Sequence, residues 1–234
     1  MKRPAVSVVM ATHNQAATLS EALKSLKAQK LPAAEAEVIV VNDGSTDETA
    51  RILRRHQGWI RLIETEHRGL VSSCNEGLAA ARGRYFTRID SDDLADPYWL
   101  LELSHLLEQD PGACCVIPDR YELHGTARRR VNVDPSNLYS LTACGTLFRT
   151  ESVRKAGGFR PFYWEEYDLY LRLKTLGPFL HWPEPLYLYR KHPGGMTHNE
   201  SERKDGWREL AQAWGSEALR AAGSHPELEF AHGS

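Results

Sequence analysis

The sequence has 234 residues, 41% of them hydrophobic and 26% charged, which is enough for one globular domain with a full apolar core. Its formal net charge is −2 and the charges are mixed along the chain, which argues against a nucleic-acid-binding protein. Four cysteines without a disulfide or metal spacing, no membrane-length apolar run and no signal-peptide pattern predict a cytoplasmic protein, at most peripheral to the inner face of a membrane.

Strands and helices alternate through the first half of the sequence. Helices are expected to begin at the capping-box patterns Thr18-Leu-Ser-Glu21 and Ser45-Thr-Asp-Glu48, and a third is expected from about Gly69 to Arg82. The predicted buried strands span 6–10, 38–41, 60–63 and 85–89. This alternation predicts the α/β class, with a Rossmann-like, mostly parallel sheet and helices on both faces.

In the second half of the sequence the pattern is looser. A helix is expected within 163–176, and the strand-like segments predict a smaller mixed sheet that covers the first. These segments are 113–118, a hairpin at 121–133, 145–149, 179–182 and 186–189. From Ser201 onward an apolar stripe that includes Trp207 and Trp214 predicts a helix packed back on the domain, with a homodimer or membrane-surface contact as the alternative.

Three carboxylates follow the strand at 85–89, at Asp90, Asp92 and Asp93. Carboxylates this close repel one another, so a fold gathers them where a cation or several hydrogen-bond donors offset the repulsion. Oxygen ligands on one side of a turn suit Mg²⁺ or Mn²⁺, which keep other positions for water and phosphate oxygens. The alternative interpretation is a solvated acidic turn before the helix at 98–110.

Five motifs occur in a characteristic order. They are Val6-Ser-Val-Val-Met-Ala-Thr-His-Asn14, Val38-Ile-Val-Val-Asn-Asp43-Gly-Ser-Thr-Asp47, the helix from Asn75-Glu-Gly77 to Ala-Arg-Gly83, Asp90-Ser-Asp92-Asp93, and Glu165-Glu-Tyr-Asp168-Leu with Leu171-Arg-Leu173. Together they resemble the glycosyltransferase family 2 enzymes of GT-A fold, and the resemblance runs from Val6 to about Tyr189. It implies a metal-dependent, inverting hexosyltransferase that moves a sugar from a nucleoside diphosphate sugar to a hydroxyl acceptor.

The resemblance assigns residues to the donor side of the site. Asp43 matches the family aspartate that hydrogen-bonds the nucleotide base, and a UDP-sugar is the expected donor. The implied nucleotide-binding residues are Thr12, Asn14, Asp43, Arg68 and Asp90. Asp90 and Asp92 are the implied ligands of Mn²⁺ or Mg²⁺, with a histidine from a mobile loop at 189–198, first His192 and second His198.

The acceptor side is assigned in the same way. Glu166 matches the aspartate that serves as catalytic base in the family, and Tyr163, Trp164 and Glu165 are the expected acceptor contacts. Asp168 is expected to pair with Arg172, four residues later on one helix face. The domain prediction is a catalytic domain at 1–200 and a helical tail at 201–234. Within the domain, 1–110 is the nucleotide-binding half and 111–200 the acceptor half with the flexible loop.

Some features keep other interpretations open. Cys74 stands where family members often have an arginine, so that phosphate or base contact is either missing or supplied by Arg68 or Arg88, which leaves the nucleotide preference open. A nucleotidyltransferase and an inactive nucleotide-sugar-binding module are the alternatives, the second because Glu166 replaces the usual aspartate. The run at 128–130 is either an anionic-lipid or lipid-diphosphate contact or a solvated turn. We expect single sugar addition in bacterial surface glycan synthesis, with a glycan, a lipid-linked sugar or a protein as acceptor.

Overall fold

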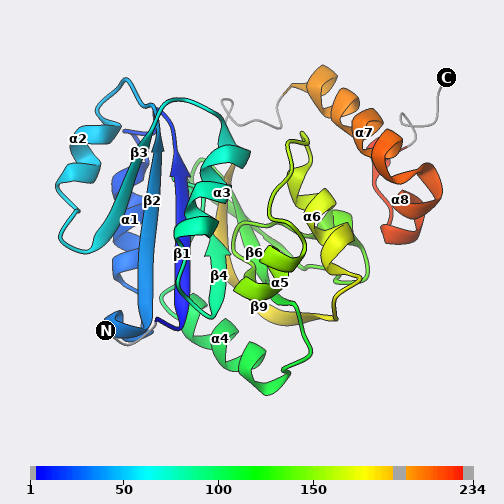
Figure 1. Cartoon of the computed structure of the whole chain (residues 1–234), viewed down its shortest axis with the longest axis horizontal. Helices are drawn as coiled ribbons and strands as arrows, with labels where there is room; N and C mark the ends of the chain where they lie inside the picture. Colours follow the sequence, from blue (N-terminus) through cyan, green and yellow to red (C-terminus); the bar gives the residue numbers. More distant parts are fainter. Residues whose placement is uncertain (1–3, 192–198, 229–234) are drawn as a thin grey trace.

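The computed structural model describes residues 4–191 and 199–228 (Figure 1). Its strands are β1 (Val6–Thr12), β2 (Ala36–Asp43), β3 (Ile60–Thr65), β4 (Tyr85–Arg88), β5 (Leu94–Ala95), β6 (Cys115–His124), β7 (Ala127–Val131), β8 (Leu147–Arg149) and β9 (Phe179–Lys191). Its helices are α1 (Leu19–Lys27), α2 (Thr49–Arg54), α3 (Leu70–Ala80), α4 (Trp99–Gln109), α5 (Thr150–Lys155), α6 (Glu165–Leu173), α7 (Glu200–Trp214) and α8 (Ser216–Ala222), with 3-10 turns η1 (Ala33–Glu35) and η2 (Leu138–Ser140). All the described strands belong to one sheet in the order β3-β2-β1-β4-β8-β6-β9-β5, with β7 paired to β6.

The first half of the sheet is parallel, as the sequence predicts. β1 pairs in parallel with β2 and β4, and β2 pairs in parallel with β3. Alternate side chains of β1 enter two different cores, with Val8 and Met10 on one face of the sheet and Val9 on the other. Because these strands are parallel, their carboxyl ends meet at one edge of the sheet.

Helices cover both faces of this sheet (Figure 1). The apolar sides of α1 and α4 pack into one core, and those of α3 and α6 pack into the other. α3 lies unusually close to β1 at Gly77, where a Cβ atom would lie 2.2 Å from Cγ1 of Val9. Only glycine permits this approach, which fixes α3 against the strand that leads into the site.

The strands of the second half make the sheet mixed. β8 is antiparallel to β4 and to β6, while β6 is parallel to β9 and β5 is antiparallel to β9. These strands extend the first sheet instead of forming a smaller second one, because β8 inserts between β4 and β6. The two predicted halves of the domain therefore share one continuous sheet.

β9 is longer than expected. The sequence predicts two short strands interrupted by Pro183 and Pro185, but β9 continues through both prolines. The register of its pairing with β6 shifts between Pro118 and Arg120, where Asp119 is opposite Pro185. A bulge accepts proline because the ladder is already interrupted there, so the strand continues past it.

The predicted capping boxes do not form. Thr18 precedes α1, but its hydroxyl donates to the backbone oxygen of Ser91 at 3.1 Å instead of capping the helix. α2 begins only at Thr49, whose backbone N–H donates to the Asp47 carboxylate at 2.9 Å. In both places the polar side chain near the helix start makes a hydrogen bond within the loops at the carboxyl ends of the parallel strands.

The helices α7 and α8 pack on α6, at the end of the molecule opposite β3 (Figure 1). Trp207 is fully buried, and its ring centroid lies 5.4 Å from that of Tyr167 on α6. Leu210 and Leu219 are buried in the same core. The packing interpretation of the C-terminal stripe is confirmed, and a dimer through this segment stays a prediction.

Candidate functional site

A cavity of about 450 Å³ opens at the carboxyl ends of β1, β2 and β4. The turn before α6 and the end of β9 form its other walls. Most of the predicted site residues line it: Thr12, Asp43, Asp90, Asp92, Tyr163, Trp164, Glu165 and Glu166. The side chains predicted for the donor and for the acceptor therefore share one space. His192 and His198 lie outside the described residues.

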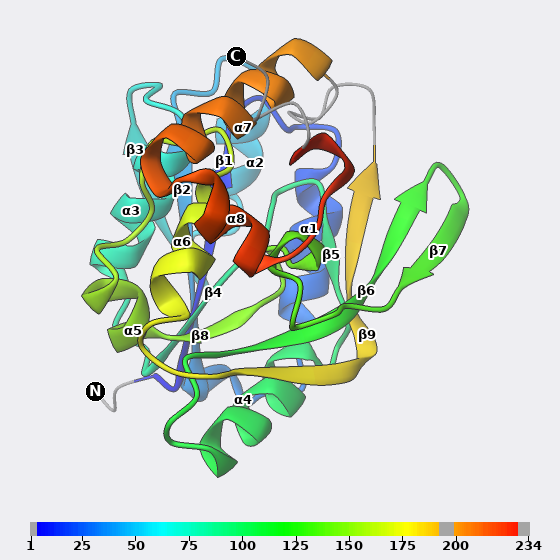
Figure 2. The same ribbon diagram turned by 90° about the vertical axis from the view of Figure 1, so that its right-hand side faces the viewer.

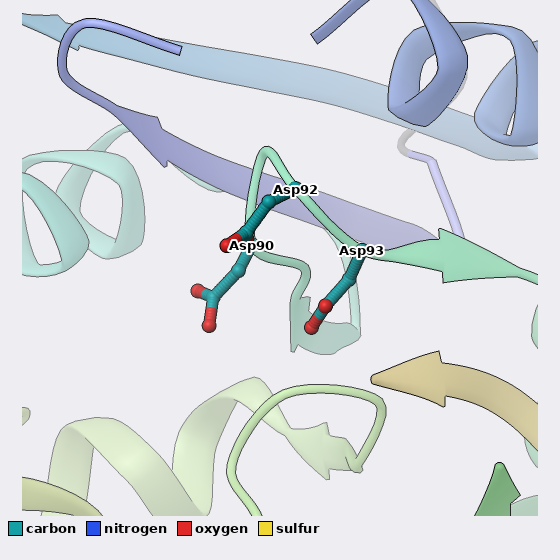
Figure 3. A group of neighbouring side chains, drawn as sticks. All are labelled: Asp90, Asp92 and Asp93. Atoms are coloured by element: carbon teal, nitrogen blue, oxygen red, sulfur yellow. The ribbon is translucent and has the colours of Figure 1, made fainter. Parts of the chain in front are cut away.

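The turn after β4 brings three carboxylates together (Figure 3). Oxygens of Asp90, Asp92 and Asp93 lie within 4.8 Å of one another. Asp93 is buried and accepts hydrogen bonds from the hydroxyl of Tyr187 and the backbone N–H of Arg190, both at 2.7 Å. Burial, reinforced by the charges of Asp90 and Asp92, raises the pKa of Asp93. Asp93 thus fastens the turn to β9, and Asp90 and Asp92 are the carboxylates that line the cavity.

The carboxylate oxygens of this turn are suitable ligands for a hard divalent cation. Asp90 and Asp92 offer carboxylate oxygens on the wall of an open cavity, the arrangement that Mg²⁺ and Mn²⁺ accept together with water and phosphate oxygens. The guanidinium of Arg88 is 3.6 Å from Asp90, so one charge of the group is partly balanced by the protein. The remaining negative charge is what a bound cation would neutralise.

Asp43 is held at the end of β2 by backbone groups. Its carboxylate accepts hydrogen bonds from the N–H groups of Arg68 and Gly69, both at 2.9 Å, and lies 2.8 Å from Nδ1 of His67. Burial alone would raise the pKa of Asp43, but the bonds from Arg68 and Gly69 hold it below the usual value. Asp43 is therefore an anion that ties β2 to the start of α3, and a nucleotide contact would use its remaining lone pairs.

Two histidines at the cavity were missed from the sequence. The rings of His13 and His67 stack with centroids 4.0 Å apart and an interplanar angle of 25°. Nδ1 of His13 lies 2.7 Å from the backbone oxygen of Asp43. Both histidines line the cavity. Both histidines could have been predicted at the cavity from their positions just after β1 and β3, since polar residues that follow parallel strands meet at one edge of the sheet.

Asn14 and Arg68 do not line the cavity. Asn14 has a φ of 51°, and its side-chain oxygen accepts hydrogen bonds from the N–H groups of Thr46 at 2.8 Å and Asp47 at 3.3 Å. The half-exposed guanidinium of Arg68 lies 4.0 Å from Glu76. Asn14 thus shapes the loop after β2, and the nucleotide contacts expected of both side chains stay predictions.

Arg88 links the turn after β4 to α6. This buried guanidinium donates to Glu165 at 2.8 Å and to the sulfur of Cys144 at 3.1 Å. It also contacts the sulfur of Cys74 at 3.8 Å and lies 3.6 Å from Asp90. Of the two arginines expected to compensate for Cys74, Arg88 is therefore the one beside it.

Two of the three acids at the start of α6 are occupied by cations. Glu165 is bound by Arg88, so its predicted acceptor contact would compete with a buried ion pair. Asp168 accepts a hydrogen bond from Nε of Arg172 at 3.0 Å, which confirms the predicted pairing. Removing either partner of a buried pair is costly because the other charge is left uncompensated. Both acids are thereby assigned structural partners.

Glu166 has a different environment. Its carboxylate accepts a hydrogen bond from the backbone N–H of Ala143 at 2.9 Å and lines the cavity. Burial, followed by the charge of Glu165, raises the pKa of Glu166 to about 7. A carboxylate with this pKa is suited to take a proton near neutral pH.

A family model, glycosyl transferase family 2, matches residues 7–164. The chain belongs to this family. Relatives of this glycosyltransferase include an uncharacterized glycosyltransferase of Haemophilus influenzae, 26% identical over 83% of this chain and 67% of that protein. Chondroitin synthase of Escherichia coli is 27% identical over 76% of this chain but only 28% of the synthase. The nucleotidyltransferase alternative has no support in these relatives.

Solved structures show the fold of this glycosyltransferase in other proteins. S. aureus TarS 1–349 in complex with UDP-GlcNAc aligns with a TM-score of 0.77 and 20% identity, over 93% of this chain and 71% of that chain. The mannosyltransferase PcManGT from Pyrobaculum calidifontis, in complex with GDP-Man and Mn²⁺, aligns with a TM-score of 0.72 and 20% identity, over 97% and 78%. The GT-A fold implied by the five motifs is confirmed.

Proposed function

We propose that this glycosyltransferase moves a sugar from a nucleoside diphosphate sugar to a hydroxyl acceptor with inversion at the anomeric carbon, and that Glu166 is the base. The observation that carries the proposal is the shared cavity. Glu166, with its raised pKa, lines the same space as Asp90 and Asp92, the carboxylates suited to a divalent ion. A base and a metal-diphosphate site on one cavity are what a single displacement requires.

The donor side rests on Asp90 and Asp92. These residues would hold Mn²⁺ or Mg²⁺, which when bound neutralises the charge of the departing diphosphate. Asp43 and Thr12 would meet the nucleoside, since both line the cavity at strand ends. A UDP-sugar is our first choice because TarS was solved with UDP-GlcNAc, and GDP-mannose is the second because PcManGT was solved with GDP-Man and Mn²⁺.

The reaction balances without any further reagent. The acceptor hydroxyl oxygen forms a bond to the anomeric carbon while the bond from that carbon to the diphosphate oxygen breaks. Its proton passes to Glu166, and the electron pair leaves with the nucleoside diphosphate. Attack from the face opposite the leaving group inverts the anomeric configuration, and Glu166, in the first turn of α6, lines the cavity into which the acceptor hydroxyl would come.

Single addition in bacterial surface glycan synthesis is part of the proposal. The Gln-x-x-Arg-Trp pattern of processive synthases does not occur in the sequence. Among residues 4–191 and 199–228, no helix has both the length and the apolarity needed to cross a bilayer. Cytoplasmic location and a peripheral membrane contact stay predictions.

The test is metal-dependent stabilisation by nucleotides. UDP-GlcNAc, UDP and GDP-mannose are added separately to the full chain, with Mn²⁺, with Mg²⁺ or with EDTA, and thermal unfolding is measured. The matching nucleotide should stabilise the fold by about 2.7 kcal/mol at a hundredfold excess over its Kd, and only when the metal is present. Equal stabilisation in EDTA would contradict the metal assignment.

Asp92→Asn is the matched variant for this test. This variant should lose the extra stabilisation that the nucleotide gives when metal is present. Without ligand it should be no less stable than the parent, because the substitution relieves carboxylate repulsion. The anomeric configuration of the product, read by NMR, then tests inversion. A chain that binds the nucleotide sugar with metal but shows neither transfer nor hydrolysis would be the inactive binding module.

A further inference from the structure

A second cavity, of about 430 Å³, adjoins the first. Thr142, Trp164, Glu166 and Tyr189 line both cavities. If the proposed function holds and the donor occupies the first cavity, the base Glu166 stands between the donor and a second compartment. A molecule in that compartment would present its hydroxyl to the base without displacing the nucleotide.

One wall of the second cavity comes from the C-terminal segment. Arg203 of α7 and the residues 225–227 line it. Arg203 and Glu227 form an ion pair at 2.8 Å, and the indole N–H of the buried Trp207 donates to Glu227 at 3.1 Å. The charges of this wall are thus paired within the wall, and its aromatic anchor fixes it against α6.

The opposite wall carries an excess of positive charge. Glu122 of β6 is bound by Arg129 at 2.7 Å, and Arg120 and Lys191 lie 3.6 and 3.9 Å from its other oxygen. Burial alone would raise the pKa of Glu122, but the hydrogen bond from Arg129 and the charges of Lys191 and Arg120 keep it lowered. Figure 2 shows the hairpin of β6 and β7 beside the end of β9, which carries Lys191. One carboxylate therefore serves three cations, of which Arg120 and Lys191 line the cavity.

The remaining lining of the cavity is aromatic. Tyr139, Trp164, Tyr167 and Tyr189 combine apolar faces with polar edges, a surface suited to a sugar ring and its hydroxyl groups. The ammonium of Lys191 lies 4.8 Å from the centroid of the Tyr189 ring. Aromatic faces and the cations that share Glu122 thus meet on this wall.

We infer that the second cavity binds the acceptor, and that the acceptor is a sugar bearing an anionic group, a phosphate or a carboxylate. Lys191 and Arg120 bind the anion, the aromatic side chains contact the ring, and a hydroxyl reaches Glu166. The C-terminal segment completes the site, so residues outside the family match at 7–164 take part in selecting the acceptor.

The test measures binding of three probes to the full chain by saturation-transfer NMR, with Mg²⁺ and UDP present. The probes are methyl glucoside, methyl glucoside 6-phosphate and methyl glucuronide. Both anionic probes, or one of them, should bind at least about tenfold more tightly than the neutral glycoside, a difference of about 1.4 kcal/mol. Which of the two anionic probes binds more tightly shows whether the site prefers a phosphate or a carboxylate. Equal binding of all three, or binding of none, overturns the inference.

Lys191→Gln and Arg128→Gln form the matched pair of variants. Arg128 lies on β7, which pairs with β6 on the side away from β9; its guanidinium lies over the ring of Tyr121, and it does not line the cavity. Lys191→Gln should remove the preference for the anion and leave methyl glucoside binding unchanged, while Arg128→Gln should alter neither. The same loss in both variants would show a general surface-charge effect and contradict the site. Failure of the proposed function appears separately, as absence of metal-dependent nucleotide stabilisation.

Discussion

Glu166 accepts a hydrogen bond from a backbone N–H, whereas its acidic neighbours Glu165 and Asp168 form ion pairs with arginines. From the sequence, Glu165, Glu166 and Asp168 are three acids at one helix start, and family resemblance alone selects among them. The partners that separate them, Arg88 and the N–H of Ala143, lie far away in the chain. Local pattern predicted the Asp168 pairing because its partner is one helical turn away, whereas the environment of Glu166 depends on tertiary contacts.

Glu166→Gln should lower turnover by about 10²–10⁴ with donor affinity retained, because the acceptor proton loses its base. The pKa of Glu166 is raised to about 7, and only its deprotonated form accepts a proton. In the parent, kcat should therefore fall as pH drops through about 7 and level off above it. Initial rates across this range check the prediction, with Glu165→Gln and Asp168→Asn as milder controls. A parent-like rate in Glu166→Gln would remove this residue from the mechanism.

Asp43→Ala should lower the free energy of unfolding by about 1–3 kcal/mol, because the N–H groups of Arg68 and Gly69 lose their acceptor. Nucleotide binding should weaken by a similar amount, about 1–3 kcal/mol, through the lost anion. Urea unfolding and nucleotide titration measure the two effects. Asp205→Ala, at an exposed ion pair with Arg208, is the control and should change neither. Unaltered nucleotide affinity in Asp43→Ala would leave this residue a purely structural role.

Among the elements, those with local signals were predicted best. The apolar runs of β1 and β2 identified buried parallel strands because their neighbours on both faces are apolar. The continuity of β9 was not predictable in the same way, since its prolines are tolerated only through a register shift on β6. The capping box at Thr18 failed because its hydroxyl has a long-range partner, the backbone oxygen of Ser91 in the turn after β4.

The packing of α7 on α6 gives a prediction for Trp207. Trp207→Ala should lower the free energy of unfolding by about 3–5 kcal/mol, since it empties a fully buried site and removes a donor to Glu227. Urea unfolding measures the loss. Leu176→Ala is the control, because Leu176 is 44% exposed and its truncation should cost little. A loss in Trp207→Ala as small as that expected for Leu176→Ala would show that the packing of α7 adds little stability to the domain.

For the whole molecule, the sequence predicted the class of fold and the edge of the sheet where the site lies. The five motifs lie on or just after the parallel strands and on α3 and α6, so their spacing carried this information. The second cavity could not be predicted, because its walls bring Arg120, Glu166 and Glu227 together from distant parts of the chain. Such a wall arises from tertiary packing and produces no periodic pattern in the sequence.

The four cysteines are buried as free thiols, as predicted. Burial raises the pKa of Cys74 to about 12, so it stays protonated at neutral pH. We expect a thiol reagent such as DTNB to react slowly with the native protein and fully with all four cysteines in guanidinium chloride. Rapid modification of one thiol in the native protein would contradict this burial.

The hydrogen bonds that Tyr187 and Arg190 make to Asp93 have a consequence for the newly made protein. On the ribosome, the first half of the sheet emerges long before β9, at about 5–20 residues per second. Until β9 docks, the turn that carries Asp90, Asp92 and Asp93 lacks the strand that fastens it. Nascent chains arrested before residue 187 should therefore bind UDP and Mn²⁺ poorly in pull-down assays, and chains extended past β9 should bind them well. The donor site would then be completed late in translation, although its strands β1, β2 and β4 are made early.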